Sequence, residues 1–132
     1  MSEQPKITGV RTIAVPVTDQ DRAVEFYVGT LGLEKRLDAP MEQLGGRWIE
    51  VAAPGAQTSL ALTPANQGTP AGVETGVRLV TPDAAVLHKA LTEAGVDADD
   101  LLLWDGIPPM FVLRDPDGNG LAVVEERGEE ER

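Results

Sequence analysis

The sequence repeats one plan at a fixed distance. Residue 12 matches residue 75, a shift of 63, and the same shift aligns helix starts, apolar positions and glycine stops without a gap. The aligned pairs are Thr12 with Thr75, Val17 with Val80, Thr18 with Thr81, Val24 with Leu87, Gly32 with Gly95 and Leu33 with Val96. Two helix starts and two stops at one offset predict two copies of one supersecondary unit.

The first copy has the order strand, helix, three strands. Residues 7–17 are rich in β-branched side chains and end at Thr18-Asp19, and a helical spacing then runs from Arg22 until Gly32 can end the helix in a left-handed conformation. Strand-like runs follow at residues 33–37, 47–52 and 58–63.

The second copy follows a bridge rich in glycine and proline, residues 65–72. A strand at residues 76–80 leads into Thr81-Pro82-Asp83, a typical helix start, and Gly95 ends that helix. Later strands are predicted at residues 101–103, 110–113 and 121–124, the last two joined by a turn at residues 115–120.

These elements predict an α+β fold. We expect two tandem βαβββ modules that form a curved mixed sheet around a concave pocket. A single domain spans residues 1–132, with module one at about 7–64, module two at about 73–126 and an acidic tail at 127–132.

The amino-acid composition limits the kinds of partner that the chain can bind. The net charge of −11 would repel a phosphate backbone, so nucleic acid is not an expected partner. The absence of cysteine excludes disulfides and thiolate metal ligands. No stretch reaches the roughly 20 apolar residues of a membrane span, and the first residues do not read as a secretory signal, so we expect a cytoplasmic protein without a membrane partner.

Four motifs are similar to those of a known family. They are Ile13-Ala14-Val15-Pro16-Val17 with Asp19, Phe26-Tyr27, Leu31-Gly32, and Arg114-Asp115-Pro116-Asp117-Gly118-Asn119. Together they resemble the vicinal oxygen chelate superfamily, which includes glyoxalase I, extradiol dioxygenases, fosfomycin-resistance enzymes and bleomycin-resistance binding proteins. The resemblance covers nearly all of residues 7–126 and implies a homodimer, in which modules pair within one chain or across two.

Metal enzymes of that superfamily place His or Glu at positions that here read Thr12, Thr75 and Ala122. A threonine hydroxyl is a poor ligand and alanine is none, so the sequence predicts no metal and no other cofactor. The alignment at Thr75 can slip by one residue, to Gly76 or to Glu74, and Glu74 would restore one carboxylate.

Two further titratable residues have more than one interpretation. Glu50 on the third strand could face the cavity as an acid, a base or a lone ligand, or it could be an edge carboxylate paired with Arg47. His88 lies mid-helix and is expected on the surface. No pair of nucleophile and base is recognisable in the sequence.

Without a metal, binding must rest on apolar and aromatic contact. Trp48 and Trp104 are candidates to stack on a ligand, or alternatively to fill the core or a dimer interface, whereas Phe111 is expected in the core. Strand alternation predicts the following residues on the concave face: Thr12, Ala14, Thr75, Val77, Met110, Val112, Arg114, Ala122 and Val124.

The leading functional hypothesis is a metal-free, homodimeric binding protein. Its ligand would be a planar or amphipathic small molecule, aromatic or cationic, and sequestering an antibiotic would confer resistance, as the resemblance to the bleomycin-resistance branch implies. The alternative is a lyase, isomerase or dioxygenase that uses an atypical metal site, or Glu50 or Glu74 as a base. A ligand-sensing partner of another protein is a third possibility.

Overall fold

The computed structural model describes residues 4–126 and contains the βαβββ unit twice, as the repeat predicts. Module one consists of β1 (Thr12–Val17), α1 (Gln20–Val24), the π-helical turn η1 (Glu25–Thr30), β2 (Glu34–Met41), the short 3-10 helix η2 (Glu42–Leu44), β3 (Gly46–Ala52) and β4 (Ser59–Pro64). Module two consists of β5 (Glu74–Thr81), α2 (Ala84–Glu93), β6 (Asp97–Ala98), β7 (Met110–Arg114) and β8 (Gly120–Glu125).

Each module has its own four-stranded sheet. The strand orders are β1-β4-β3-β2 and β5-β8-β7-β6. In both sheets the first strand pairs in parallel with the last, and the remaining neighbours are antiparallel. The two sheets are therefore copies of one topology.

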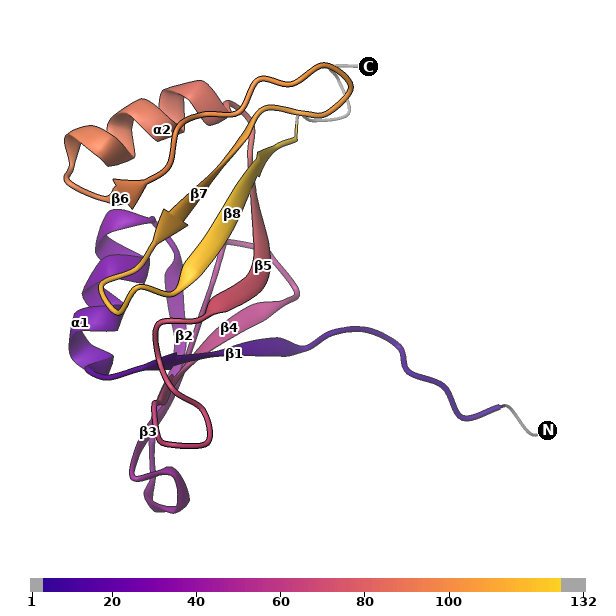
Figure 1. The fold of residues 1–132 in the computed structure, drawn as a ribbon. Coiled ribbons are helices and arrows are strands. Elements are labelled where there is room, and N and C mark those ends of the chain that lie inside the picture. The colour runs from indigo at the N-terminus through magenta and orange to yellow at the C-terminus, as the bar shows by residue number, and fades with distance from the viewer. Residues whose placement is uncertain (1–3, 127–132) are drawn as a thin grey trace.

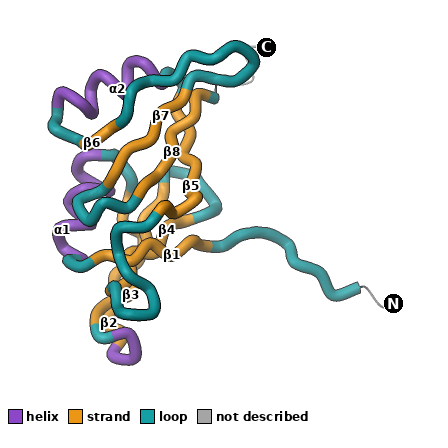
Figure 2. Tube along the Cα trace, in the orientation of Figure 1, coloured by secondary structure: helices purple, strands orange, loops and turns teal. Residues whose placement is uncertain are grey.

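Helices α1 and α2 lie on one side of the molecule and the strands on the other (Figure 1). The faces that meet the helices carry the core, in which Val15, Tyr27, Ile49, Phe111 and Leu113 are fully buried. Figure 2 shows the loops at the ends of the strands, and the first described residues leading away from the body. One face of each sheet thus remains without a covering helix.

The predicted helix punctuation is confirmed. The side chain of Asp19 accepts a hydrogen bond from the backbone N–H of Arg22, and Asp83 caps α2 in the same way. Gly32 and Gly95 follow the two helices with φ angles of 84° and 90°, where residues with a side chain are strained.

Two predicted strands differ in the structure. Residues 7–11 form no strand, because β4 begins at Ser59 and offers residues upstream of Thr12 little to pair with. Residues 101–103 are not a strand either. The backbone N–H of Asp99 bonds to the Val112 carbonyl, and that of Leu102 to the Met110 carbonyl. The chain therefore advances by three residues on this side for two residues of β7, which is a bulge. Pairing with β7 is limited to β6 and to an isolated bridge at Leu102. The predicted acidic tail at 127–132 lies outside the described residues.

Candidate ligand-binding site

The open face of module one carries alternate residues of three neighbouring strands. Thr12 lies opposite Ser59, Ala14 opposite Ala61, and Ala61 opposite Glu50. Directly paired residues project to the same side of a sheet, so these five share the face that no helix covers.

A buried carboxylate stands in the middle of this face. Glu50 is only 6% exposed, and its Oε2 accepts hydrogen bonds from Trp48 Nε1 at 2.7 Å and from Arg11 Nη1 at 3.1 Å. Its Oε1 accepts one from Ser59 Oγ at 2.9 Å. We call Arg11, Thr12, Trp48, Glu50 and Ser59 the Glu50 cluster; Thr12 joins it by donating to the Ser59 carbonyl oxygen at 3.1 Å.

These donors determine the charge of Glu50. The hydrogen bond from Trp48 lowers the pKa of the Glu50 carboxyl, with further lowering by Arg11 and Ser59, and together they outweigh the opposing effect of burial. Glu50 is therefore an anion at neutral pH. A carboxylate with a lowered pKa and occupied lone pairs is a weak general base, but it is a strong partner for a cation.

The contact from Arg11 differs from the other two. Its side chain is 73% exposed, whereas that of Glu50 is 8% exposed, and Arg11 precedes β1 at the end of the N-terminal segment. Removing the partner of a buried charge is costly, because the charge is left uncompensated. A cationic ligand that took the place of the exposed Arg11 would keep the Glu50 carboxylate paired.

The open face of module two combines apolar residues with an arginine of β7. Met110 lies opposite Val124, and Val112 opposite Ala122, so the structure brings together four of the predicted residues. Arg114 lies opposite Gly120 on the same face, where its guanidinium forms two hydrogen bonds with Asp99, at 3.0 and 3.1 Å. The hydrogen bonds to Asp99 raise the pKa of Arg114, so this arginine stays protonated and its charge is balanced by the Asp99 carboxylate.

The register of β5 changes the predicted lining. Glu74 pairs with Gly120 and Arg78 with Ala122, so β5 holds two more residues between these points than β8 does. Gly76 lies in this bulge with φ of 78°. As a result Glu74 and Arg78 have the open-face positions, whereas Val77 lies on the inner face with 5% exposure, contrary to the prediction.

Thr75 belongs to the bulge. Its hydroxyl donates to the Gly120 carbonyl oxygen at 2.7 Å and accepts from the Val77 N–H at 3.0 Å. The first of these contacts repeats that of Thr12 with the Ser59 carbonyl, so the two threonines are equivalent in the repeat. Both hydroxyls therefore donate a hydrogen bond to a backbone carbonyl oxygen of the neighbouring strand.

Trp104 and His88 lie apart from the Glu50 cluster. Trp104 is in the loop between β6 and β7, with 64% of its surface exposed. His88, which we expected on the surface, is partly buried. Its ring packs edge-on against Phe111 with a centroid distance of 5.0 Å, and Nε2 lies 2.9 Å from the Asp99 carbonyl oxygen. His88 supports the packing of α2 on its sheet.

The donors on these faces do not suit a divalent metal. Within residues 4–126, no three His, Cys, Asp or Glu side chains come together in a group that could hold one. Thr12 and Ala122 occupy two of the three family positions, and the Glu50 carboxylate already accepts three hydrogen bonds. A catalytic metal requires three or more imidazole or carboxylate donors that converge on one point.

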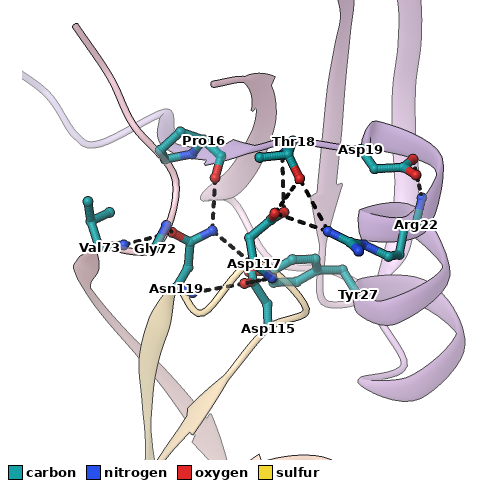
Figure 3. A network of polar contacts seen from close by, with 10 residues as sticks. All are labelled: Pro16, Thr18, Asp19, Arg22, Tyr27, Gly72, Val73, Asp115, Asp117 and Asn119. Atoms are coloured by element: carbon teal, nitrogen blue, oxygen red, sulfur yellow. Dashed lines mark hydrogen bonds and ion pairs between the residues drawn. The ribbon is translucent and has the colours of Figure 1, made fainter. Parts of the chain in front are cut away.

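A polar network fixes how the two modules sit together (Figure 3). Asn119 is fully buried; its Nδ2 donates to the Pro16 carbonyl oxygen, and its Oδ1 accepts from the N–H groups of Gly72 and Val73. Asp115 accepts hydrogen bonds from Asn119 and from the hydroxyl of Tyr27. The turn from Asp115 to Asn119 is therefore a contact between modules.

Asp117 extends the network toward α1. Its carboxylate accepts hydrogen bonds from the N–H and hydroxyl of Thr18 and forms an ion pair with Arg22 at 3.0 Å. Burial and the charge of Asp115 raise the pKa of Tyr27, which stays protonated and able to donate. The relative orientation of the two open faces depends on this network.

The sequence does not predict three residues that lie at or near the open faces: Arg11, Ser59 and Arg78. Ser59 could have been found from alternation, because it begins the fourth strand on the face shared with Ala61. Arg11 has no such signal, since it lies outside the strand. The position of Arg78 depends on the bulge at Gly76, which the sequence marks only with a glycine.

Known proteins share this architecture. Residues 9–123 match the model of a family described as the Glyoxalase/Bleomycin resistance protein/Dioxygenase superfamily. TnmS3, an antibiotic binding protein from Streptomyces sp. CB03234, has a similar structure, with a TM-score of 0.82 and 34% identity over 92% of this chain and 98% of that one. A superfamily member from Sphaerobacter thermophilus is 37% identical over 91% of this chain and 98% of its own, with a TM-score of 0.81.

A curated relative is similar over a shorter stretch. The Bacillus subtilis protein YetH, described as uncharacterized, is 38% identical over 58 residues, which make up 44% of this chain. The match spans about half of that relative, 48% of its length. Separately, none of the helices in the described part of the chain is long and apolar enough to cross a membrane.

Proposed function

Since the chain belongs to the Glyoxalase/Bleomycin resistance protein/Dioxygenase superfamily, we propose that it binds and sequesters a planar cationic small molecule without a metal. The observation that carries this proposal is the Glu50 cluster, in which a buried anion lies beside an indole on an open sheet face. An aromatic face and a carboxylate together suit a flat ring system with a positive charge. The antibiotic-binding protein TnmS3 has a similar structure, which supports an antibiotic as the ligand.

The charge of the whole chain supports a cation. The net charge of −11 raises the local concentration of cations at the surface and speeds their association. At the site itself, a ligand cation would take the place of Arg11 beside Glu50, and the apolar residues of β7 and β8 on the open face of module two would cover its rings.

A second copy of the chain would complete the pocket. Both sheets have a face that no helix covers, and residues 4–11 extend away from the body with Ile7 92% and Val10 62% exposed (Figure 1). We propose a homodimer in which these apolar side chains and the open faces are buried. Such burial is worth roughly 25 cal/mol per Å² of apolar surface.

Ligand binding is tested with two three-ring probes of opposite charge, proflavine as the cation and anthracene-9-carboxylate as the anion. We expect proflavine to bind, Glu50→Gln to weaken it by about tenfold, the loss of one charge-assisted hydrogen bond, and Arg11→Gln to strengthen it. Anthracene-9-carboxylate should bind weakly. Equal proflavine affinity in the wild type and in Glu50→Gln would refute the role of Glu50.

The two tryptophans separate stacking from other contacts. In the Trp104→Phe protein, Trp48 is the single indole, and proflavine should still quench it; the reciprocal Trp48→Phe protein should bind proflavine about tenfold more weakly. An unchanged affinity in Trp48→Phe would remove stacking from the proposal.

Two further measurements test the rest of the proposal. Elemental analysis of protein purified without chelators should find no stoichiometric divalent ion, and about one per chain would favour the enzymatic alternative. Light scattering after gel filtration should give twice the chain mass. The Ile7→Ser/Val10→Ser double variant should shift toward the monomer, with Gln4→Ser as its control, and a wild-type monomer would overturn the dimer.

A further inference from the structure

The structure contains a cavity on the inner, helix-facing side of the two sheets. Its volume is about 420 Å³, within the range of roughly 300–1,000 Å³ for small-molecule pockets. The lining combines inner-face residues of both sheets with residues of α2, among them Ile13, Leu60, Leu113, Leu87 and Leu91. Among the described residues that line it, none belongs to the Glu50 cluster. The cavity is therefore separate from the proposed site for cations.

Burial distinguishes the floor of the cavity from its mouth. Val51 and Leu113 are fully buried and Leu91 is 3% exposed, so these residues form the floor. Val80 is 61% exposed and Ala53 is exposed as well, so the mouth lies at β5 and at the loop between β3 and β4. A small molecule can therefore enter from solvent and reach the core.

The side chains of the lining are aliphatic with two exceptions. The hydroxyl of Thr58 donates to the Val10 carbonyl oxygen at 2.9 Å, so its hydrogen is already used. Arg78 belongs to the lining because the cavity follows consecutive residues of β5, but its register opposite Ala122 places its side chain on the open face. Aliphatic side chains therefore form the walls on the inner side of the sheets.

Walls of this kind hold water poorly. A buried water molecule typically makes about three hydrogen bonds, which aliphatic side chains do not offer. An engineered cavity of about 150 Å³ with leucine, isoleucine and phenylalanine walls stays dry and binds benzene. The present cavity is larger, at about 420 Å³, and on the same scale it has room for roughly two or three rings.

We infer that this cavity is a second ligand site, which takes an uncharged, apolar molecule of two or three rings. A charged ligand is disfavoured, because burying a charge among aliphatic side chains without a partner is costly. A ligand in the cavity contacts both modules, so binding stabilises the folded chain. The inference does not rest on the proposed binding of planar cations, because the lining residues and the ligand charge are different.

The probe is N-phenyl-1-naphthylamine, an uncharged molecule whose fluorescence increases in apolar surroundings. Its emission should rise on binding with a stoichiometry of one per chain. The charged analogue 8-anilinonaphthalene-1-sulfonate has the same rings and should bind at least tenfold more weakly. At one hundred times its Kd, N-phenyl-1-naphthylamine should raise the Tm by roughly 5–10 °C. Equal affinity for the two probes would contradict an uncharged ligand.

Nuclear magnetic resonance locates the bound probe. We expect isotope-filtered nuclear Overhauser effects between the aromatic protons of N-phenyl-1-naphthylamine and the methyl groups of Leu60, Leu87 and Leu91. Effects to the methyl groups of Ala14 or Met110 in their place would put the probe on an open face and overturn the inference.

A variant with a smaller cavity tests the volume. Ala56→Phe fills part of the cavity from a half-buried loop position, while the backbone carbonyl of residue 56 can still accept the hydrogen bond from Arg36. It should weaken the binding of N-phenyl-1-naphthylamine by tenfold or more. Ala85→Phe makes the same change at an exposed position of α2 and is the matched control, with unchanged affinity. Circular dichroism checks that both variants fold, and equal affinities in the two would overturn the inference.

A segment of a second copy is the competing occupant of the cavity. Ile7 and Val10 are exposed apolar residues, and an exchanged N-terminal segment could insert them. If the Ile7→Ser/Val10→Ser variant binds N-phenyl-1-naphthylamine and the wild type does not, the segment fills the cavity and the inference is wrong; binding by neither protein overturns it as well. Glu50→Gln should leave the affinity unchanged, which keeps this test separate from that of the planar cation.

Discussion

The hydroxyl of Tyr27 lies 2.8 Å from Oδ2 of Asp115, a residue 88 positions further along the chain, and both groups are buried. This hydrogen bond joins the helical segment of module one to the turn before β8 in module two. Because the acceptor is charged and shielded from water, the bond is of the stronger kind.

Replacing Tyr27 with phenylalanine keeps the ring and removes this bond. We expect a loss of about 1.5–3 kcal/mol in the free energy of unfolding, because the Asp115 carboxylate loses a donor without gaining water. Urea denaturation followed by circular dichroism measures the change. In a double-mutant cycle with Asp115→Asn, the two losses should add to more than that of the double variant, and strict additivity would show that the two groups do not interact.

Asn119 should tolerate even less change. Asn119→Asp places a carboxylate oxygen where Nδ2 now donates to Asp115 and to the Pro16 carbonyl, so we expect destabilisation by about 3–5 kcal/mol. Asn66→Asp is the matched control, because that exposed side chain only accepts hydrogen bonds, from Gly68 and Thr69. Chemical denaturation should show the control within about 0.5 kcal/mol of wild type. Similar losses at both positions would contradict the role of the Asn119 amide.

The Glu50 cluster predicts a pH dependence at acid pH. The pKa of Glu50 is lowered from 4.5, so its contacts stabilise the folded state above pH 4.5 and are lost as the pH falls through the folded-state pKa. In the Trp104→Phe background, emission from Trp48 should change with a midpoint below pH 4.5, because protonation weakens the acceptor for the indole N–H. The same titration of Glu50→Gln should be flat. A midpoint above pH 4.5 would mean that burial dominates.

The bulge at Gly76 gives a further prediction. Gly76 has φ of 78°, so Gly76→Ala should cost about 1–2 kcal/mol in backbone strain alone, since an added Cβ meets no other atom. Gly29→Ala is the control: it lies in η1 without a positive φ and with open space around it, and should be neutral or stabilising. Thermal denaturation compares the two. Equal stability would show that the bulge can relax to a regular strand.

The sequence predicts the repeat, the helix caps and the succession of helices and strands along the chain, because these depend on local chemistry and on a pattern seen twice. Asp19, Asp83, Gly32 and Gly95 have the roles that the sequence suggests. The alternation of β7 and β8 likewise brings Met110, Val112, Ala122 and Val124 to one face.

The sequence does not predict which side chains of β5 lie on the open face, nor which residues donate hydrogen bonds to Glu50. A single glycine decides whether Val77 or Arg78 faces outward, and nothing in the sequence around Gly76 distinguishes a bulge from a regular strand. Trp48 precedes Glu50 by two residues on β3, but Arg11 and Ser59 meet at Glu50 only when β4 lies between β1 and β3. Such contacts depend on strand order, which local patterns do not contain.

The turn from Asp115 to Asn119 also bears on how a duplicated chain diverges. The shift of 63 residues that aligns the two copies places Ala90 at the position of Tyr27 and Ala85 at that of Arg22. Module two therefore lacks the donors that its own turn requires, and module one, with Ala53-Pro54-Gly55-Ala56 before its last strand, lacks the acceptors. In the contacts of Tyr27 and Arg22, module one supplies the donors and module two the acceptors of one hydrogen-bond network. A chain built from two copies of either half would lack the hydrogen bonds that hold the two modules in their relative orientation.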